Sequence, residues 1–232
     1  MRLCSTDASW LVYVVNCRIN DLTLRSVPQR LLIHAGYASW RARSFLVAGD
    51  SGTGKTTLLC KLLLAGASVH CDERVALDGL QVMPIPRKIH LKLTSLAQLP
   101  ELQPLVRQAR KHGELWDSVM AFEPTALGRE WVADPGGVDA VFVLEPNHQG
   151  DSCLSELSGS SLTTALIQQI TNFHSENRME MKALIQLAAS VKGYLLRVGN
   201  LNQAVRQIAA ALEPGSPELE QNSLAPQRVG SR

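Results

Sequence analysis

Aromatic side chains and a charge excess of either sign are both scarce in this chain of 232 residues. Four phenylalanines, three tyrosines and four tryptophans make up only 5% of the sequence. Lysine and arginine number 23 against 21 aspartates and glutamates, for a formal net charge of +2. Nucleic-acid-binding surfaces rely on stacked aromatic rings and strongly basic grooves. The composition therefore predicts a protein that does not bind nucleic acid.

The sequence also lacks long apolar runs and a regular cysteine pattern. The longest apolar run near the amino terminus covers residues 10–15, whereas a membrane helix needs about 20 residues. No basic segment leads into a long apolar core, so we expect no signal peptide and no contact with a membrane. The five cysteines are scattered, without a C-x-x-C pair or zinc-ligand spacing. They are typical of reduced thiols in a cytoplasmic protein.

The length and the C-terminal composition predict one domain and a tail. A domain usually has about 100–200 residues, so this chain corresponds to one large domain. From Pro214 onward the sequence holds three prolines and few hydrophobic residues. Such a segment buries too little apolar surface to offset the entropy lost on ordering. We expect a single domain over residues 1–213 and a disordered tail over residues 214–232.

Short apolar segments and helical patterns alternate along the chain. The segments of strand length are residues 10–25 (two strands with a turn at Asn20-Asp21), 31–35, 44–48, 67–71, 74–78, 80–84, 138–144 and 194–198. Helical spacing covers residues 56–65, 95–112 with breaks at Pro100 and Pro104, 160–173, 179–192 and 200–212, with Asn200 or Asn202 as the N-cap of the last helix. This alternation predicts an α/β layer fold with some antiparallel β structure near its start.

A phosphate-binding loop is the strongest motif in the sequence. Residues 49–56 match G-x-x-x-x-G-K-[ST], between an apolar strand and a leucine-patterned helix, as the motif requires. Glycines let successive backbone N–H groups point at phosphate oxygens, and the helix dipole adds positive potential. Lys55 should reach the β- and γ-phosphates, and the Thr56 hydroxyl should bind Mg²⁺. The predicted nucleotide-binding residues are Gly49, Asp50, Ser51, Gly52, Thr53, Gly54, Lys55, Thr56 and Thr57.

Two acidic segments could complete such a site. The segment 134–137 (DPGG) loosely matches the D-x-x-G stretch of GTPases, but the chain has no N-K-x-D guanine-binding motif, and Pro-Gly favours a tight turn. The other segment is Asp72-Glu73, at the end of the predicted strand 67–71. Adjacent side chains point to opposite faces there, so one carboxylate could face the phosphates. A surface turn with solvated charges is an equally good interpretation of these two residues.

Several motifs together resemble the HPr kinase family and its shorter relatives. They are residues 32–35 (LIHA), 49–58 (GDSGTGKTTL), 71–77 (CDERVAL), 83–92 (MPIPRKIHLK) and, more weakly, 194–205. The resemblance implies a β-rich P-loop core flanked by helices, similar to ATP-dependent phosphoenolpyruvate carboxykinase. It also implies transfer of the γ-phosphoryl group of ATP to a hydroxyl, typically a serine.

The resemblance also implies roles for individual residues. His34 matches a histidine near the phosphates, although a core histidine in a strand is an alternative interpretation. Asp72 matches the acid that accepts the hydroxyl proton. Glu73 matches a metal-binding acid, so that Thr56, Asp72 and Glu73 would hold Mg²⁺; the family carries a second aspartate at the position of Glu73. Arg87 or Lys88 could bind the γ-phosphate or an anion on the acceptor, because arginine suits bidentate oxygen contacts. Solvated charges are a comparable interpretation of these two side chains.

Several functions remain compatible with the sequence. The acceptor could be a serine of a peptide or protein, including a ribosomal-peptide precursor as in lasso-peptide kinases, or a small hydroxyl compound. A regulatory nucleotide switch or ATPase would use the segment 134–137. The third candidate is a binding or scaffold protein without catalytic activity. Family members often assemble, so the resemblance also allows a homo-oligomer.

Overall fold

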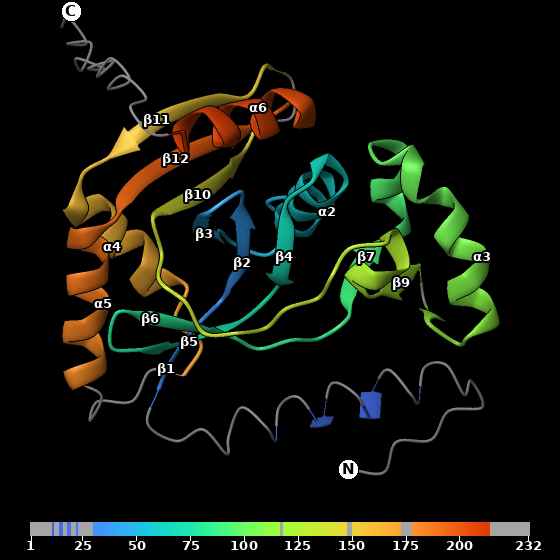
Figure 1. Ribbon diagram of the computed structural model, residues 1–232, viewed down its shortest axis with the longest axis horizontal. Coiled ribbons are helices and arrows are strands. Elements are labelled where there is room, and N and C mark those ends of the chain that lie inside the picture. The colour runs from blue at the N-terminus through green and yellow to red at the C-terminus, as the bar shows by residue number, and fades with distance from the viewer. Residues whose placement is uncertain are drawn as a thin grey trace, which may run out of the picture.

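The computed structural model describes residues 30–116, 118–147, 150–172 and 178–213, together with the isolated positions Leu11, Val14, Val15, Arg18, Ile19 and Leu22 (Figure 1). The predicted disordered tail, residues 214–232, lies outside the described residues. Nothing in the structure tests the predicted division into one domain and a tail, which stays a prediction. Within the part of the chain that is described, no helix is long and apolar enough to cross a membrane.

A six-stranded mixed sheet forms the centre of the fold. Its strand order is β11-β12-β10-β3-β2-β4. The strands are β2 (Ala35–Trp40), β3 (Arg43–Ala48), β4 (Ser68–Cys71), β10 (Ala140–Pro146), β11 (Cys153–Leu157) and β12 (Lys192–Val198). β3, β10 and β12 run parallel to one another, whereas β2 is antiparallel to both β3 and β4. The mixed α/β class predicted from the sequence is confirmed.

Helices cover both faces of this sheet (Figure 1). They are α2 (Lys55–Ala65) and α6 (Leu201–Ala211) on one face, and α4 (Gly159–Gln168) and α5 (Arg178–Ser190) on the other. Side chains of a strand alternate between faces. Accordingly, Phe45 and Val47 of β3 pack in the hydrophobic cluster of α2 and α6, while Leu46 and Ala48 pack in that of α4 and α5. The side chain of Asn200 accepts a hydrogen bond from the Gln203 N–H and caps α6, as one of the two predicted candidates.

Two small antiparallel sheets lie beside the central one. One contains β1 (Leu31–Ile33), β5 (Val75–Asp78) and β6 (Gln81–Pro84) in the order β1-β5-β6. The other contains β7 (Ile89–Lys92), β8 (Leu115–Trp116) and β9 (Val119–Phe122) in the order β7-β9-β8, and it lies next to α3 (Gln103–Lys111) (Figure 1). Of these short strands, β7, β8 and β9 were not predicted, nor were β2 and β11 of the central sheet.

The predicted strands in residues 10–25 are wrong at every described position. Leu11, Val14, Val15, Arg18, Ile19 and Leu22 are all helical. The β-branched composition of the segment favoured strands, but such a propensity is weak and is overridden at these positions.

The predicted helix over residues 95–112 is confirmed in three pieces. They are η1 (Leu93–Ala97), η2 (Pro100–Leu102) and α3; η1 and η2 are 3₁₀ helices, and a third 3₁₀ segment of the described residues, η3 (Pro124–Leu127), follows later in the chain. Pro100 begins η2, and Pro104 lies in the first turn of α3. Proline lacks an N–H group but is tolerated in the first turn of a helix, where that N–H has no intrahelical partner. The prolines therefore start new helical pieces here.

Candidate functional site

Residues 49–54 form a loop that wraps around the first turn of α2. Gly52 and Gly54 have φ of 91° and 92°, in the left-handed region that glycine adopts without strain. Thr53 closes the loop on itself, because its N–H and its hydroxyl both donate to the Asp50 carbonyl, at 3.3 and 2.9 Å. Gly54 occupies the N-cap position without a side-chain cap, which leaves the first backbone N–H groups of α2 available to an anion.

Lys55 is held beneath this loop by a half-buried histidine, His34. The side chain is only 7% exposed, and its Nζ lies 3.0 Å from His34 Nε2 and 3.4 Å from the Gly49 carbonyl oxygen. Burial lowers the pKa of Lys55 to about 8, against the opposing effect of the Asp72 carboxylate. Burial and the Lys55 charge lower the pKa of His34 to about 4. His34 is therefore neutral near pH 7, and its Nε2 accepts a hydrogen bond from the Lys55 ammonium.

Gln169 connects His34 to the loop, and the sequence did not predict this role. It is 7% exposed, and its Nε2 donates to Asp50 Oδ1 at 2.9 Å. Its backbone carbonyl accepts the His34 N–H at 2.8 Å, and its side chain also bonds that of His34. The Asp50 carboxylate, predicted to lie among the nucleotide-binding groups, is thus used to fix the loop to the turn after α4.

Asp72 is buried at the end of β4, with 2% of its surface exposed. Its Oδ1 lies 3.5 Å from Arg87 Nε, and its carboxylate also receives the backbone N–H of His90. Burial raises the pKa of Asp72, whereas Arg87, the His90 N–H and Lys55 lower it. A group this deeply buried is not a solvated charge on a surface turn. Of the two interpretations that the sequence left open for Asp72, only the internal carboxylate fits.

Arg87 pairs with both members of the acidic pair. Its guanidinium contacts the carboxylates of Asp72 and Glu73, and Arg74 Nε lies 4.0 Å from Glu73 Oε1. Arg87 does not line the cavity described below, so in this structure it is placed to neutralise the acids rather than to touch a phosphate. Lys88 points elsewhere, to Glu114 and Glu123. Two adjacent carboxylates need such a counter-charge when one of them is buried.

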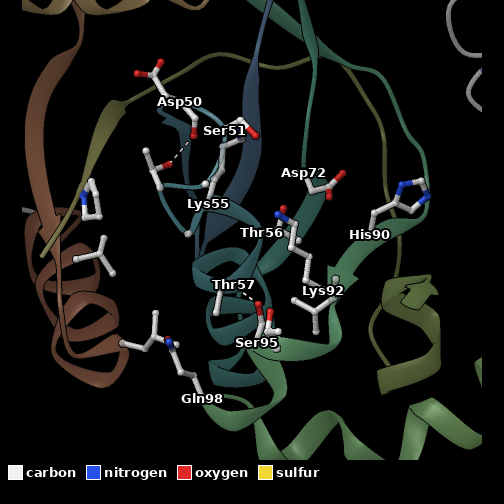
Figure 2. A pocket seen from close by; sticks show the side chains of 18 of the residues that line it. Asp50, Ser51, Lys55, Thr56, Thr57, Asp72, His90, Lys92, Ser95 and Gln98 are labelled. Carbon is white, nitrogen blue, oxygen red and sulfur yellow. Dashed lines mark hydrogen bonds between the residues drawn. The ribbon is translucent and has the colours of Figure 1, made fainter. Parts of the chain in front are cut away.

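One cavity of about 510 Å³ gathers most of these groups (Figure 2). It opens where the carboxyl ends of β3, β4, β10 and β12 meet, the usual place for ligands in open α/β sheets. The predicted residues on its wall are His34, Asp50, Ser51, Gly52, Thr53, Gly54, Lys55, Thr56, Thr57, Asp72 and Glu73. Gly49, Arg87 and Lys88 are the predicted residues that do not line it.

The rest of the wall comes from segments that the sequence did not assign to the site. His90 and Lys92 belong to β7, Ser95 and Gln98 to η1 and its end, and Asn147 follows β10. Thr57 ties this wall to α2, because its hydroxyl donates to Ser95 Oγ at 3.1 Å. The alternation in residues 89–92, apolar then polar, is the only sequence signal that could have indicated two pocket-facing side chains.

The oxygen donors of the cavity suit a magnesium ion only with help from a ligand. Thr56, Asp72 and Glu73 all line the cavity, and a hydroxyl and carboxylates are the hard oxygen ligands that Mg²⁺ prefers. No group of three or more His, Cys, Asp or Glu residues that could hold a metal occurs among the described residues. Mg²⁺ commonly completes its shell with water and substrate phosphate oxygens, and these residues fit that arrangement.

The segment 134–137 takes no part in the cavity. Gly136 pairs with Val82 of β6 through two backbone hydrogen bonds of 2.8 and 3.0 Å, and the Gly137 carbonyl accepts from the Tyr37 hydroxyl at 3.0 Å. Asp134 is exposed and is not on the cavity wall. The favoured interpretation as a tight turn is therefore wrong, because residues 134–137 contain no turn and Gly136 forms an antiparallel bridge to Val82 of β6.

Comparisons with known proteins give a distant similarity in fold. No protein-family model matches the chain, and no curated protein matches it. Among solved structures, the fold is similar to that of the Hpr(Ser) kinase/phosphatase from Coxiella burnetii, with a TM-score of 0.40 and 11% sequence identity, covering 76% of this chain and 85% of that chain. A similarity at this level does not establish a common activity, and the relationship to the HPr kinase family stays a prediction.

Proposed function

We propose that this chain is a phosphotransferase that moves the γ-phosphoryl group of MgATP to a hydroxyl group. One observation carries the proposal: residues 50–54 of the loop, the buried Lys55 and the buried Asp72 line a single cavity. A phosphate-binding loop with a lysine needs only an internal base and room for an acceptor to become a kinase site. A cavity of about 510 Å³ is within the range of small-molecule sites.

The residues would divide the reaction as follows. Backbone N–H groups of the loop and the Lys55 ammonium bind the phosphates, and Thr56 with the acidic pair would hold Mg²⁺, which offsets phosphate charge when bound. Asp72 accepts the proton of the acceptor hydroxyl while that oxygen bonds to the γ-phosphorus and the bond to the ADP oxygen breaks. The raised pKa of Asp72 makes it a stronger base than an ordinary carboxylate.

The acceptor is proposed from the sequence resemblance rather than from the cavity. A serine of a peptide or protein is the acceptor that the resemblance implies, and a small hydroxyl compound is the alternative. Cytoplasmic location and assembly into a homo-oligomer likewise stay predictions from the sequence.

The test is phosphate transfer from γ-labelled ATP in the presence of Mg²⁺ and serine-containing acceptors. We expect Lys55→Ala to lose both nucleotide binding and transfer, because it removes the cation beneath the loop. Asp72→Asn should retain nucleotide binding but lose transfer by about 100-fold or more, the usual loss for a general base. Asp134→Asn is a matched control, since Asp134 is exposed and does not line the cavity.

Two results would contradict the proposal. Unchanged transfer in Asp72→Asn would remove Asp72 from the reaction. Release of label only to water, together with a loss of activity in Asp134→Asn, would instead support the nucleotide switch that uses the segment 134–137.

A further inference from the structure

Strand β7 carries two polar side chains on the cavity side of an otherwise buried strand. Ile89 and Leu91 are each 1% exposed and pack in the hydrophobic cluster of α2. Because side chains alternate along a strand, His90 and Lys92 point the other way, and both line the cavity. The packing of Ile89 and Leu91 and the hydrogen bond between Thr57 and Ser95 fix this strand relative to the phosphate-binding loop.

Lys92 differs from the other cations near the cavity in having no partner. The structure gives its ammonium no hydrogen bond or ion pair with any residue in the described ranges, although Lys92 is exposed to the cavity. By contrast, Lys55 bonds His34 and the Gly49 carbonyl, and Arg87 is occupied by Asp72 and Glu73. Figure 2 shows the Lys92 side chain extending from β7 toward Thr56 and Asp72.

The position of Lys92 suits the proposed reaction, which needs a cation near the γ-phosphoryl group. Charge spreads over the γ-phosphoryl oxygens during transfer, and many phosphotransferases supply a cation in addition to the loop lysine and the metal. Arg87 is unsuited to that task here, because it neutralises the acidic pair and does not line the cavity. A lysine with a free ammonium on the facing wall can reach the outermost phosphate without breaking an ion pair.

We propose that Lys92 is a catalytic residue that binds the γ-phosphoryl group opposite Lys55. This inference rests on the proposed function and adds to it a cation from the second small sheet. Lys92 would contact the terminal phosphate only, whereas the loop and Lys55 also hold the β-phosphate. The site therefore closes on a triphosphate from two sides, α2 on one and β7 on the other.

The test compares the affinities of the full chain for MgATP and MgADP by calorimetry, together with the rate of ATP hydrolysis in the absence of an acceptor. Lys92→Gln should weaken MgATP binding by about ten- to a hundredfold, as expected for one charge-assisted contact, and leave MgADP binding unchanged. Lys92→Arg should restore most of the loss. Lys111→Gln, an exposed lysine of α3, is the matched control.

The outcomes separate this inference from the proposed function. Binding of neither nucleotide by the wild-type chain would overturn the proposed function and this inference together. If the wild-type chain binds both nucleotides and Lys55→Ala loses both, the phosphate site stands. Equal affinities of Lys92→Gln and the wild-type chain for MgATP, or an equal loss for MgATP and MgADP, would then overturn the role of Lys92 alone.

Discussion

At the scale of single residues, Lys55 and His34 show how removal from water changes the pKa of a side chain. Removing an ammonium from water is unfavourable unless hydrogen-bond or charge partners compensate for the lost hydration. Lys55 has two acceptors, the His34 ring and the Gly49 carbonyl, and a carboxylate nearby, yet its pKa still falls to about 8. Its charge is therefore sensitive to moderate alkali, unlike that of a surface lysine.

Nucleotide affinity should therefore fall as the pH rises through about 8. The ammonium that binds phosphate is present below that pKa and is lost above it, so ADP affinity should decrease by up to about tenfold per pH unit, the limit for one linked proton. Calorimetric titrations with ADP between about pH 7 and pH 10 measure this. In Lys55→Arg the guanidinium stays charged throughout that range, so any remaining affinity should be flat. A flat profile in the wild-type chain would contradict the assignment.

Arg87 shows the limit of residue types as a guide. Its sequence context suggested a phosphate or acceptor contact, because arginine suits both. The structure instead uses its guanidinium on Asp72 and Glu73. Nothing in the sequence around Arg87 tells whether its guanidinium binds a phosphate or a carboxylate. The carboxylates that it does bind, those of Asp72 and Glu73, come from another part of the chain.

At the scale of elements, the loop between β3 and α2 depends on backbone conformation rather than on side-chain contacts. Gly54 has φ of 92° and ψ of 11° at the N-cap of α2. A Cβ added at this glycine would meet no atom within 4 Å, so space does not require glycine here. The left-handed conformation does, because it disfavours any residue with a Cβ.

Gly54→Ala should lower the free energy of unfolding by about 1–2 kcal/mol, the cost of the left-handed conformation, and weaken nucleotide binding. Urea denaturation and ADP titration measure the two effects. Gly137→Ala is the control, because its added Cβ also meets nothing within 4 Å but its φ is not positive. Equal stability of the two variants would show that the loop has another conformation in solution.

At the scale of the whole molecule, the site lies where the central sheet, the sheet of β7 and helix α2 meet, so the fold half-buries its two histidines, His34 and His90. Burial lowers the pKa of His34 and that of His90 from 6.5 to about 4. The unfolded chain takes up these protons at a higher pH than the folded chain does. The stabilising contribution is therefore present above about pH 6.5 and is lost as the pH falls toward 4.

The free energy of unfolding should accordingly decrease between pH 6.5 and pH 4. Urea denaturation at several pH values in this range measures the slope. In the double variant His34→Gln, His90→Gln the slope should be smaller, because the two titrating groups are gone. Asp72 acts in the opposite direction, since its raised pKa lets the folded chain take up a proton first. An unchanged slope in the double variant would show that neither histidine causes the acid sensitivity.

The sequence by itself determined the local parts of the site. The glycine spacing of residues 49–54 and the leucine pattern after Lys55 encode a loop and a helix through interactions between near neighbours. The strand 68–71 followed by two acids was equally readable, because one apolar segment and its end are local features. The described positions within residues 10–25 are the exception, since the β-branched composition favoured strands and these positions are helical.

Only the tertiary structure decided what surrounds those parts. His90 and Lys92 reach the cavity from a separate sheet, Gln169 reaches the loop from the turn after α4, and Arg87 covers the acidic pair. The segment 134–137 lies outside the site, because Gly136 pairs with Val82 of β6. Such contacts join residues far apart in the chain, and packing of the hydrophobic clusters, rather than any local pattern, brings them together.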